Sequence, residues 1–346
     1  MYKLILKPLL FALGIEQARA LAIWLLKFIG FLPAGRKLLH AFYAVEDSSL
    51  EREIFGLSFK NPVGLAAGFD LNGEVVEELS ALGFGFVEIG SITAEPEVGN
   101  PKPRVFRLPK DRAIINRLGH PNRGWICAIE NLRRRSKGVK VGCNITSTNS
   151  VEVMDLVSKE YLKSFRNLYQ YVDYFTVNVP YDAIAGEANT TLEQNLHNII
   201  DPLFEFRRGQ SDYRPILIKI SPDLNDEAID LVTDIMIETP LDGVVAVGST
   251  RSREALKTSK LSLQKIGSGR LSGEPLARRA IEVVRRVRQR SGGAYPIIGV
   301  GGIKTGEDVK AMIEAGASLV QLYSSFVYEG PAVAGKICKS LLKPLD

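Results

Sequence analysis

Short apolar runs alternate with amphipathic helical patterns from residue 50 to the end of the chain, and this alternation limits the folds open to it. Each apolar run is continuous, as parallel strands covered on both faces require. The runs expected to form strands are residues 61–68, 84–93, 139–145, 174–179, 215–220, 243–248, 296–303 and 318–324. Eight strand-helix units predict a TIM (β/α)8 barrel with an N-terminal helical extension. An open doubly wound sheet is the alternative, and it accommodates eight units less naturally.

A glycine turn follows the seventh of these runs. The run ends in Gly301 and Gly302, and a capped helix is expected to begin before Asp308. Glycine lets the backbone approach a ligand, and the N–H groups of such a turn and of a helix N-terminus favour an anion. A second turn of small residues, 323–325, follows the eighth run. The pair matches the phosphate site of barrel enzymes, although the glycines alone are also typical of an ordinary strand-to-helix turn.

Barrel enzymes carry their chemistry at the carboxyl ends of the strands. In this chain those positions form a polar ring: Ala67, Gly68, Asp70, Ser91, Asn144, Asn178, Lys219, Gly248, Ser249, Gly301, Gly302, Tyr323 and Ser324. Lys219 lies between Ile218 and Ile220, where a buried ammonium needs an anionic partner. That partner is either the edge of a flavin that becomes anionic on reduction or an acid such as Glu88. The three histidines and three cysteines form no ligand cluster, so no metal site is predicted.

Residues 1–45 differ from the rest of the chain in charge. They hold six basic residues and one acid, whereas the remaining 38 basic and 38 acidic residues balance. No nucleic-acid surface is therefore predicted on the body. The apolar runs of this segment are too interrupted to span a bilayer, and no signal-peptide cleavage site follows them. We expect two amphipathic helices, roughly 8–20 and 21–32, attached peripherally to the cytoplasmic face of the cell membrane. Packing of these helices on the core is the alternative.

Eight motifs are spread over nearly the whole chain: F-K-N-P-V-G-L-A-A-G-F-D, G-F-G-F-V-E-I-G-S-I-T, G-N-P-K-P-R-V-F-R-L, I-N-R-L-G, L-I-K-I-S-P-D-L, L-S-G-E-P-L, I-I-G-V-G-G-I and G-A-S-L-V-Q-L-Y-S. Together with the N-terminal segment, they resemble the membrane-associated, quinone-linked dihydroorotate dehydrogenases of pyrimidine biosynthesis. The resemblance implies an FMN-binding barrel at 46–346. It also implies a helical segment at 1–45 for the membrane and a quinone.

The resemblance further implies roles for individual residues. Those expected around FMN are Ala67, Gly68, Ser91, Asn144, Asn178, Lys219, Gly273, Gly301, Gly302, Tyr323 and Ser324. Arg107 and Tyr323 are expected where a quinone tunnel from the N-terminal helices meets the flavin. The residues expected to face a small-molecule substrate are Asn116, His120 and Ser249.

The substrate side departs from the family pattern. Leu71 replaces a lysine that touches flavin and substrate, the N-R-x-G-F-N loop ends in His120-Pro121, and T-N-T reads Val247-Gly248-Ser249. The loop N-x-S-S-P-N-T reads Asn178 to Ala183, so the serine base is absent. Tyr181 becomes the catalytic candidate, and its phenol is better suited to donate a proton than to accept one.

These departures predict a flavin-dependent oxidoreductase with altered or lost dihydroorotate activity. Two alternatives stay open. One is an authentic dihydroorotate dehydrogenase with a rearranged loop, and the other is a non-catalytic FMN-binding protein at the membrane.

Overall fold

Eight parallel strands close into a barrel in the computed structural model, which describes residues 6–136, 138–148, 153–181 and 189–343. In chain order the strands are β3 (Val63–Leu65), β4 (Phe86–Ile92), β7 (Lys140–Ile145), β8 (Tyr174–Asn178), β9 (Ile216–Ile220), β10 (Gly243–Ala246), β12 (Ile297–Val300) and β13 (Leu319–Leu322). Each strand pairs with the next in this order, and β13 pairs with β3 to close the ring. The predicted TIM barrel and its eight strands are confirmed.

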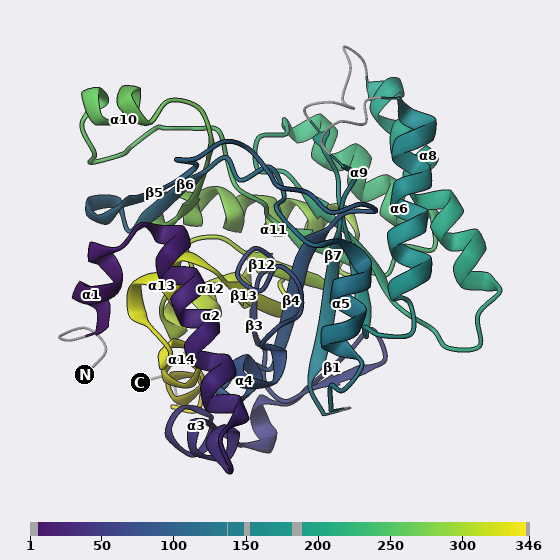
Figure 1. Ribbon diagram of the computed structural model, residues 1–346. Helices are drawn as coiled ribbons and strands as arrows, with labels where there is room; N and C mark the ends of the chain where they lie inside the picture. The colour runs from purple at the N-terminus through teal and green to yellow at the C-terminus, as the bar shows by residue number, and fades with distance from the viewer. Residues whose placement is uncertain (1–5, 137, 149–152, 182–188, 344–346) are drawn as a thin grey trace.

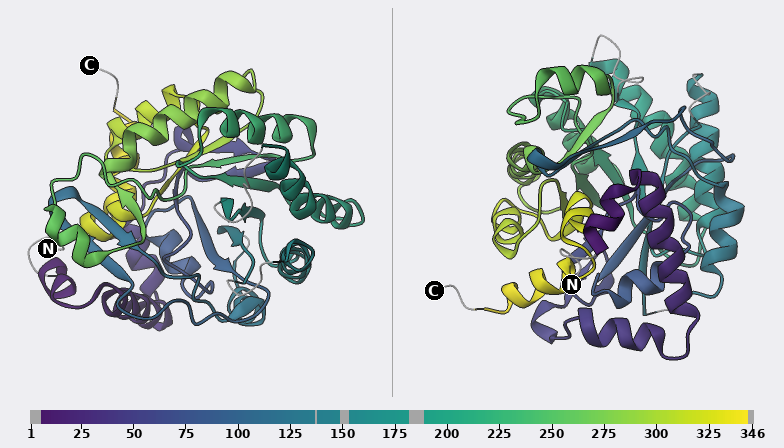
Figure 2. Two further views of the ribbon diagram at one scale, coloured as in Figure 1. Left: turned by 90° about the horizontal axis from the view of Figure 1, so that it is seen from above. Right: turned by 60° about the vertical axis from the view of Figure 1, so that its left-hand side comes forward.

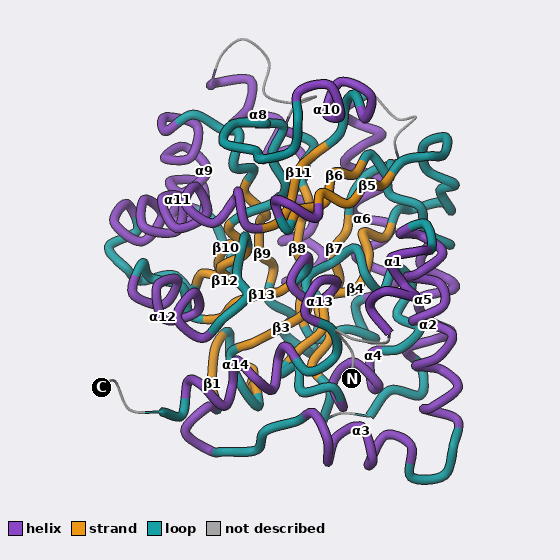
Figure 3. Tube along the Cα trace, turned by 90° about the vertical axis from the view of Figure 1, so that its left-hand side faces the viewer, coloured by secondary structure: helices purple, strands orange, loops and turns teal. Residues whose placement is uncertain are grey.

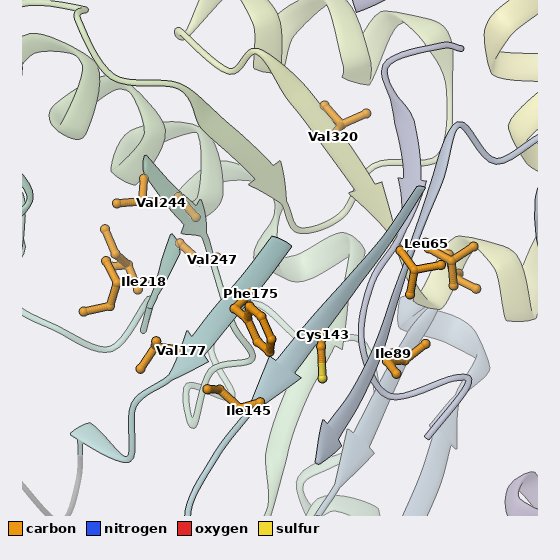
Figure 4. Packing of buried hydrophobic residues seen from close by; sticks show 14 of the residues in the cluster. Leu65, Ile89, Cys143, Ile145, Phe175, Val177, Ile218, Val244, Val247 and Val320 are labelled. Atoms are coloured by element: carbon orange, nitrogen blue, oxygen red, sulfur yellow. The ribbon is translucent and has the colours of Figure 1, made fainter. Parts of the chain in front are cut away.

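Helices that follow the strands cover the outside of the barrel (Figures 1 and 2). They are α4 (Val76–Ala81), α5 (Gly124–Leu132), α6 (Met154–Leu168), α8 (Asn189–Arg208), α9 (Asp226–Glu238), α11 (Ala277–Arg290), α12 (Gly306–Glu314), α13 (Ser324–Glu329) and α14 (Val333–Leu341). Figure 4 shows strand side chains of the buried core, including Ile89, Cys143, Phe175 and Ile218. This layer between strands and helices is the larger part of the hydrophobic core.

Side chains alternate along each strand between that outer layer and the barrel interior. In β9, Ile216, Ile218 and Ile220 belong to the outer core, whereas Leu217 belongs to a separate inner cluster. Lys219 therefore shares the inner face with Leu217, one step closer to the carboxyl end of the strand. The period of the strand thus directs a lysine into the barrel.

Apolar side chains fill the amino-terminal half of the barrel interior. The inner cluster includes Phe86, Tyr174, Leu217, Val245, Ile298 and Leu319. A hairpin of β1 (Arg52–Ile54) and β2 (Leu57–Phe59) adds Phe59 to it, with the ring of Phe59 edge-on to Phe86 at 5.2 Å. Polar inward side chains lie above this cluster, in a buried layer around Glu88 and at the carboxyl ends of the strands.

A second sheet, which was not predicted, lies over those carboxyl ends. It consists of antiparallel strands β5 (Val105–Leu108), β6 (Ala113–Asn116) and β11 (Arg270–Gly273). Figure 3 shows these three strands above the barrel strands, with the short helix α10 (Lys260–Ile266) beyond them. The sheet brings residues from two distant parts of the chain to one end of the barrel.

Three helices precede the barrel: α1 (Lys7–Ala12), α2 (Ile15–Phe31) and α3 (Gly35–Tyr43). Figure 1 shows them together along one flank, beside α4 and α13. The predicted break between residues 20 and 21 was wrong. The helices break at Gly14 and at Pro33 instead, since glycine is a poor helix former and proline cannot continue a helix. Among the described residues no single helix is long and apolar enough to cross a membrane, and α2 and α3 meet that test only together, across a 114° bend.

Candidate active site

A cavity of about 810 Å3 lies at the carboxyl ends of the barrel strands. All of the residues predicted to surround FMN line it, and so do Asn116, His120, Tyr181 and Ser249. The structure therefore brings together side chains from the strand ends, from the covering sheet and from the loops between them. What each of these residues binds stays a proposal.

Three polar side chains at the strand ends hold one another in place. Ser91 Oγ donates to Asn144 Oδ1 at 2.5 Å, and Asn178 Nδ2 donates to Ser91 Oγ at 3.3 Å. Asn144 Nδ2 donates in turn to Glu88 Oε1 at 3.1 Å. Each hydrogen bond fixes the orientation of the next side chain, so this wall of the cavity is preorganised.

Glu88 lies fully buried in the barrel below this wall. Its carboxylate also accepts hydrogen bonds from Gln321 Nε2 at 2.8 Å, Thr176 Oγ1 at 3.0 Å and the Tyr174 hydroxyl at 3.3 Å. All of these donors are neutral. The alternative in which Glu88 satisfies Lys219 is therefore not supported.

Lys219 forms no hydrogen bond or ion pair within the described part of the chain, although it lines the cavity. Three buried polar atoms of the cavity walls likewise have no partner among the described residues: Tyr181 Oη, Gln321 Oε1 and Ser325 Oγ. Leaving such groups unsatisfied costs roughly 1–3 kcal/mol each. A ligand with an anionic edge and several polar atoms, as FMN has, fits this set of orphaned groups.

The glycine turn after β12 has backbone conformations that favour glycine. Gly301 and Gly302 have φ angles of 136° and 71°, and a Cβ on Gly302 would lie 2.5 Å from an alanine Cβ of α11. The following helix does not contribute as predicted. Thr305 and Asp308 form a capping box in which the Asp308 carboxylate accepts the Thr305 N–H at 2.9 Å. Because its own aspartate neutralises the N-terminus of α12, an anion at this turn would depend on the glycine N–H groups instead.

The residues predicted to face the substrate converge on Arg270. This arginine lies opposite Asn116 in the covering sheet, and its Nη1 donates to the Ser249 carbonyl and to Asp223 Oδ2, both at 3.1 Å. Burial lowers the pKa of the His120 imidazole, and the charge of Arg270 lowers it further. Sequence patterns did not single out Arg270, because its position depends on the pairing of β11 with β6.

Basic side chains far outnumber acidic ones around the cavity. Those that line it are Arg112, Arg117, Lys219, Arg251, Arg253, Arg270 and Lys304. Glu274 is the one carboxylate among the described lining residues, and it pairs with Arg112 and with Lys304. Arg251 and Arg253 lie in the loop that follows the sixth barrel strand, a signal that could have identified them. Such a cavity suits anionic ligands.

Tyr181 lines the cavity with a buried hydroxyl. Burial raises the pKa of the Tyr181 phenol well above its ordinary value, and the neighbouring Tyr161 adds to the shift. The phenol therefore stays protonated, and it is suited to donate a hydrogen bond rather than to accept or release a proton. Asp182 and Ala183, which follow in the same loop, fall outside the described residues.

A second, apolar cavity of about 200 Å3 lies between the N-terminal helices and the barrel. It shares Gly68, Leu118 and Tyr323 with the larger cavity, so the two meet at these residues. Arg107 lines it as predicted, and its guanidinium donates to the carbonyl oxygens of Leu13 at 2.8 Å and Leu10 at 3.0 Å. Arg107 thus satisfies carbonyl groups at the end of α1.

Comparison with known proteins adds an independent finding. A family model described as dihydroorotate dehydrogenase matches residues 49–345. The chain belongs to the dihydroorotate dehydrogenase family. It is similar to the dihydroorotate dehydrogenase (quinone) of Christiangramia forsetii, with 42% identity over 99% of both chains. It is also 38% identical to that of Thermosynechococcus vestitus, over all of this chain and 97% of the relative. The crystal structure of ligand-free DHODH from Eimeria tenella shares 32% identity at a TM-score of 0.83, covering 94% of each chain.

The family finding corrects the prediction of altered or lost dihydroorotate activity, which was wrong. Relatives that match this chain over nearly its full length are quinone-linked dihydroorotate dehydrogenases, and the chain is a flavin oxidoreductase of that family. The prediction treated each missing lysine, amide or serine as a loss without replacement. The same cavity is lined by Arg251, Arg253, Arg270 and His120, whose polar groups the prediction did not consider as replacements.

Proposed function

We propose that this chain is an authentic dihydroorotate dehydrogenase that oxidises dihydroorotate to orotate with FMN and delivers the electrons to a quinone. The observation that carries the proposal is the larger cavity, where the lining residues that the structure describes include seven basic side chains and one carboxylate. FMN brings a phosphate and dihydroorotate brings a carboxylate, so both ligands are anionic. The names of the full-length relatives support the same reaction.

FMN, when bound, supplies an acceptor for a hydride and a route for electrons to a second substrate. We propose that the glycine N–H groups at 301–302 and the turn at Ser324 hold its phosphate. Ala67, Gly68 and Gly273 would allow close approach of the backbone, and the remaining predicted cofactor residues, Ser91, Asn144, Asn178, Lys219 and Tyr323, would contact the ring system. Lys219 would lie against the ring edge that becomes negative on reduction, since an ammonium without a carboxylate partner is stabilised by such an anion.

The substrate is proposed to bind beside Asn116, His120 and Ser249, with Arg270 nearby to attract its carboxylate. An arginine fork can bind a carboxylate through two parallel hydrogen bonds. Tyr181 would act as a hydrogen-bond donor to the substrate, in keeping with the raised pKa that keeps its phenol protonated.

The quinone is proposed to enter through the apolar cavity beneath α1 and α2 and to meet the flavin near Tyr323, with Arg107 at its wall. Residues 1–45 would form this entrance and would attach it peripherally to the membrane, on the cytoplasmic face, while 46–346 form the barrel. The exposed apolar side chains of α2 and α3 support attachment: Phe31 is 90% exposed and Phe42 is 73% exposed. Aromatic side chains of this kind insert into the interface of a bilayer.

Steady-state turnover of the full chain in lipid vesicles tests the proposal. With dihydroorotate and a quinone present, orotate should form and quinone should be consumed in equal amounts. The wild-type chain loaded with FMN should turn over at about 1 per second or faster, as enzymes typically do. Absence of orotate with every quinone tried would contradict the proposed function.

A further inference from the structure

We propose that His120 is the proton acceptor of the larger cavity, the group that takes the proton leaving the substrate during oxidation. The inference rests on the proposed function and adds a catalytic role that the family's serine position no longer supplies. Three observations support it: His120 lies at the cavity wall, its backbone is held by hydrogen bonds, and few other described groups in the cavity can accept a proton.

His120 is held in an unusual backbone conformation at the cavity wall. Its φ is 52°, in the left-handed region that few non-glycine residues adopt, and Gly119 before it has a φ of 68°. The Asn122 side chain fixes this turn, since its Nδ2 donates to the His120 carbonyl and to Thr93 Oγ1, both at 2.8 Å. Strain of this kind persists where surrounding contacts enforce it, and it concentrates at functional sites.

The rest of the loop is anchored as firmly as His120. Asn100 donates through its backbone N–H to the Leu118 carbonyl at 2.9 Å and through its side chain to the Arg117 carbonyl at 2.9 Å. The Arg117 guanidinium donates to the carbonyls of Ile266 at 2.6 Å and Ser268 at 2.8 Å. The imidazole is therefore presented on a rigid loop, as a group that must meet a substrate carbon requires.

Few other described groups of the cavity can take a proton at neutral pH. Lysine and arginine are ordinarily already protonated. Glu274 is occupied by Arg112 and Lys304, and Tyr181 stays protonated because burial raises the pKa of its phenol. His120 differs from these groups, since burial and the nearby Arg270 lower its pKa and keep the imidazole neutral.

The proposed step balances in atoms and electrons. A proton leaves one ring carbon of dihydroorotate for a nitrogen of the His120 imidazole, which becomes an imidazolium. FMN, when bound, would supply the acceptor for a hydride from the adjacent ring carbon, and the two carbons would become doubly bonded in orotate. The quinone would take up the two electrons and the proton of that hydride, together with one proton from solvent, to become the quinol, and the imidazolium would return its proton to solvent. Among the charged or titratable groups that share the cavity with His120, Arg270 comes from β11, Arg251 and Arg253 from the segment before it, and Arg117 from its own loop. The other described groups of this kind that line the cavity are Arg112, Tyr181, Lys219, Glu274, Lys304, Tyr323 and Tyr328.

The test compares His120→Asn with the wild-type FMN-loaded chain. Asparagine tolerates the left-handed conformation of residue 120 but cannot accept a proton near neutral pH. Anaerobic flavin reduction by dihydroorotate is followed from pH 5 to pH 9. The wild-type rate should fall as the pH drops through a value below about 6.5, where the imidazole becomes protonated. The variant should not show this fall in rate at low pH, which we call the acid limb of the pH profile. It should also react about 100- to 10,000-fold more slowly.

Three controls make the result specific. His197→Asn changes a partly exposed histidine on α8 and should keep both the wild-type rate and the acid limb. Tyr181→Phe should keep the acid limb, because the phenol is not the acceptor. The FMN content of His120→Asn should equal that of the wild type, which excludes misfolding. The inference would be overturned if the rate of Tyr181→Phe no longer fell at low pH while the rate of His120→Asn still did.

A readout without turnover completes the test. The chain has three histidines, so the imidazole proton resonance of His120 can be assigned by its absence in His120→Asn. In the FMN-loaded wild type it should titrate with a midpoint below about 6.5 and move when orotate is added. An unmoved resonance at saturating orotate would overturn the inference, as would an unchanged rate in His120→Asn. A wild-type chain that dihydroorotate does not reduce at any pH would overturn the proposed function instead.

Discussion

Side chains alternate in direction along β9, and this alternation directs the charged side chain of Lys219 into the barrel. It has no carboxylate partner in the described part of the chain. Lys219→Met should therefore leave the FMN-free protein as stable as the wild type or more so, because an unpaired charge is removed. FMN affinity should fall about 10- to 100-fold, the equivalent of roughly 1.5–3 kcal/mol for a hydrogen bond to a charged group. FMN titration and thermal unfolding measure the two effects. Lys260→Met, on the exposed helix α10, is the matched control, and equal FMN affinity in both variants would contradict this role.

The sequence predicted the location, at one end of the barrel, of residues whose position follows from a barrel strand. Asn144, Asn178 and Lys219 lie at strand ends, so the fold itself places them in the cavity. Arg270 could not be found in this way, because its place depends on a pairing between strands that are far apart in the chain. The electrostatic environment of His120 depends on the same pairing, so its neutral state could not be predicted either.

At the scale of single elements, α1 is attached to the barrel partly through the Arg107 side chain of β5. Arg107 donates to carbonyl oxygens at the end of α1, and its guanidinium lies 4.5 Å from the centre of the Phe11 ring. Arg107→Met should leave those carbonyls without their donor and increase hydrogen exchange in residues 7–13. Flavin reduction by dihydroorotate should be retained while the rate of quinone reduction falls, because α1 borders only the apolar cavity.

Lys110→Met, which changes an exposed residue of the same region, serves as the control for Arg107→Met. Unchanged exchange in residues 7–13 of Arg107→Met would show that α1 is held by other contacts.

The barrel elements were predictable and the additions to the barrel were not. Continuous apolar runs mark parallel strands at any position in the chain. The strands β5, β6 and β11 are short and antiparallel, and the pairing of β11 with β6 spans a long separation in sequence. Their pattern does not differ from that of a loop until the pairing partner is known. The breaks at Gly14 and Pro33 carried a local signal that the predicted helix boundaries did not use.

At the scale of the whole molecule, the exposed aromatic face of α2 and α3 is proposed to bind anionic membranes. Replacing both Phe31 and Phe42 with serine should weaken co-sedimentation of the full chain with anionic vesicles. The expected loss is about tenfold per residue, from roughly 1.5 kcal/mol of lost apolar burial each. Higher salt should weaken binding further, because residues 1–45 carry a strong excess of basic residues. Leu261→Ser, on the distant helix α10 and 63% exposed before substitution, should bind like the wild type. Equal binding of all three proteins would contradict attachment through this face.

The central claim is that the larger cavity oxidises dihydroorotate with the basic side chains and the histidine that line it. The most direct measurement is anaerobic mixing of the FMN-loaded wild-type chain with dihydroorotate near pH 8, without quinone, while the absorbance of oxidised flavin is recorded. We predict bleaching at about 1 per second or faster, with one orotate formed for each flavin reduced. A flavin that stays oxidised in excess dihydroorotate, yet is bleached at once by a chemical reductant, would contradict the claim.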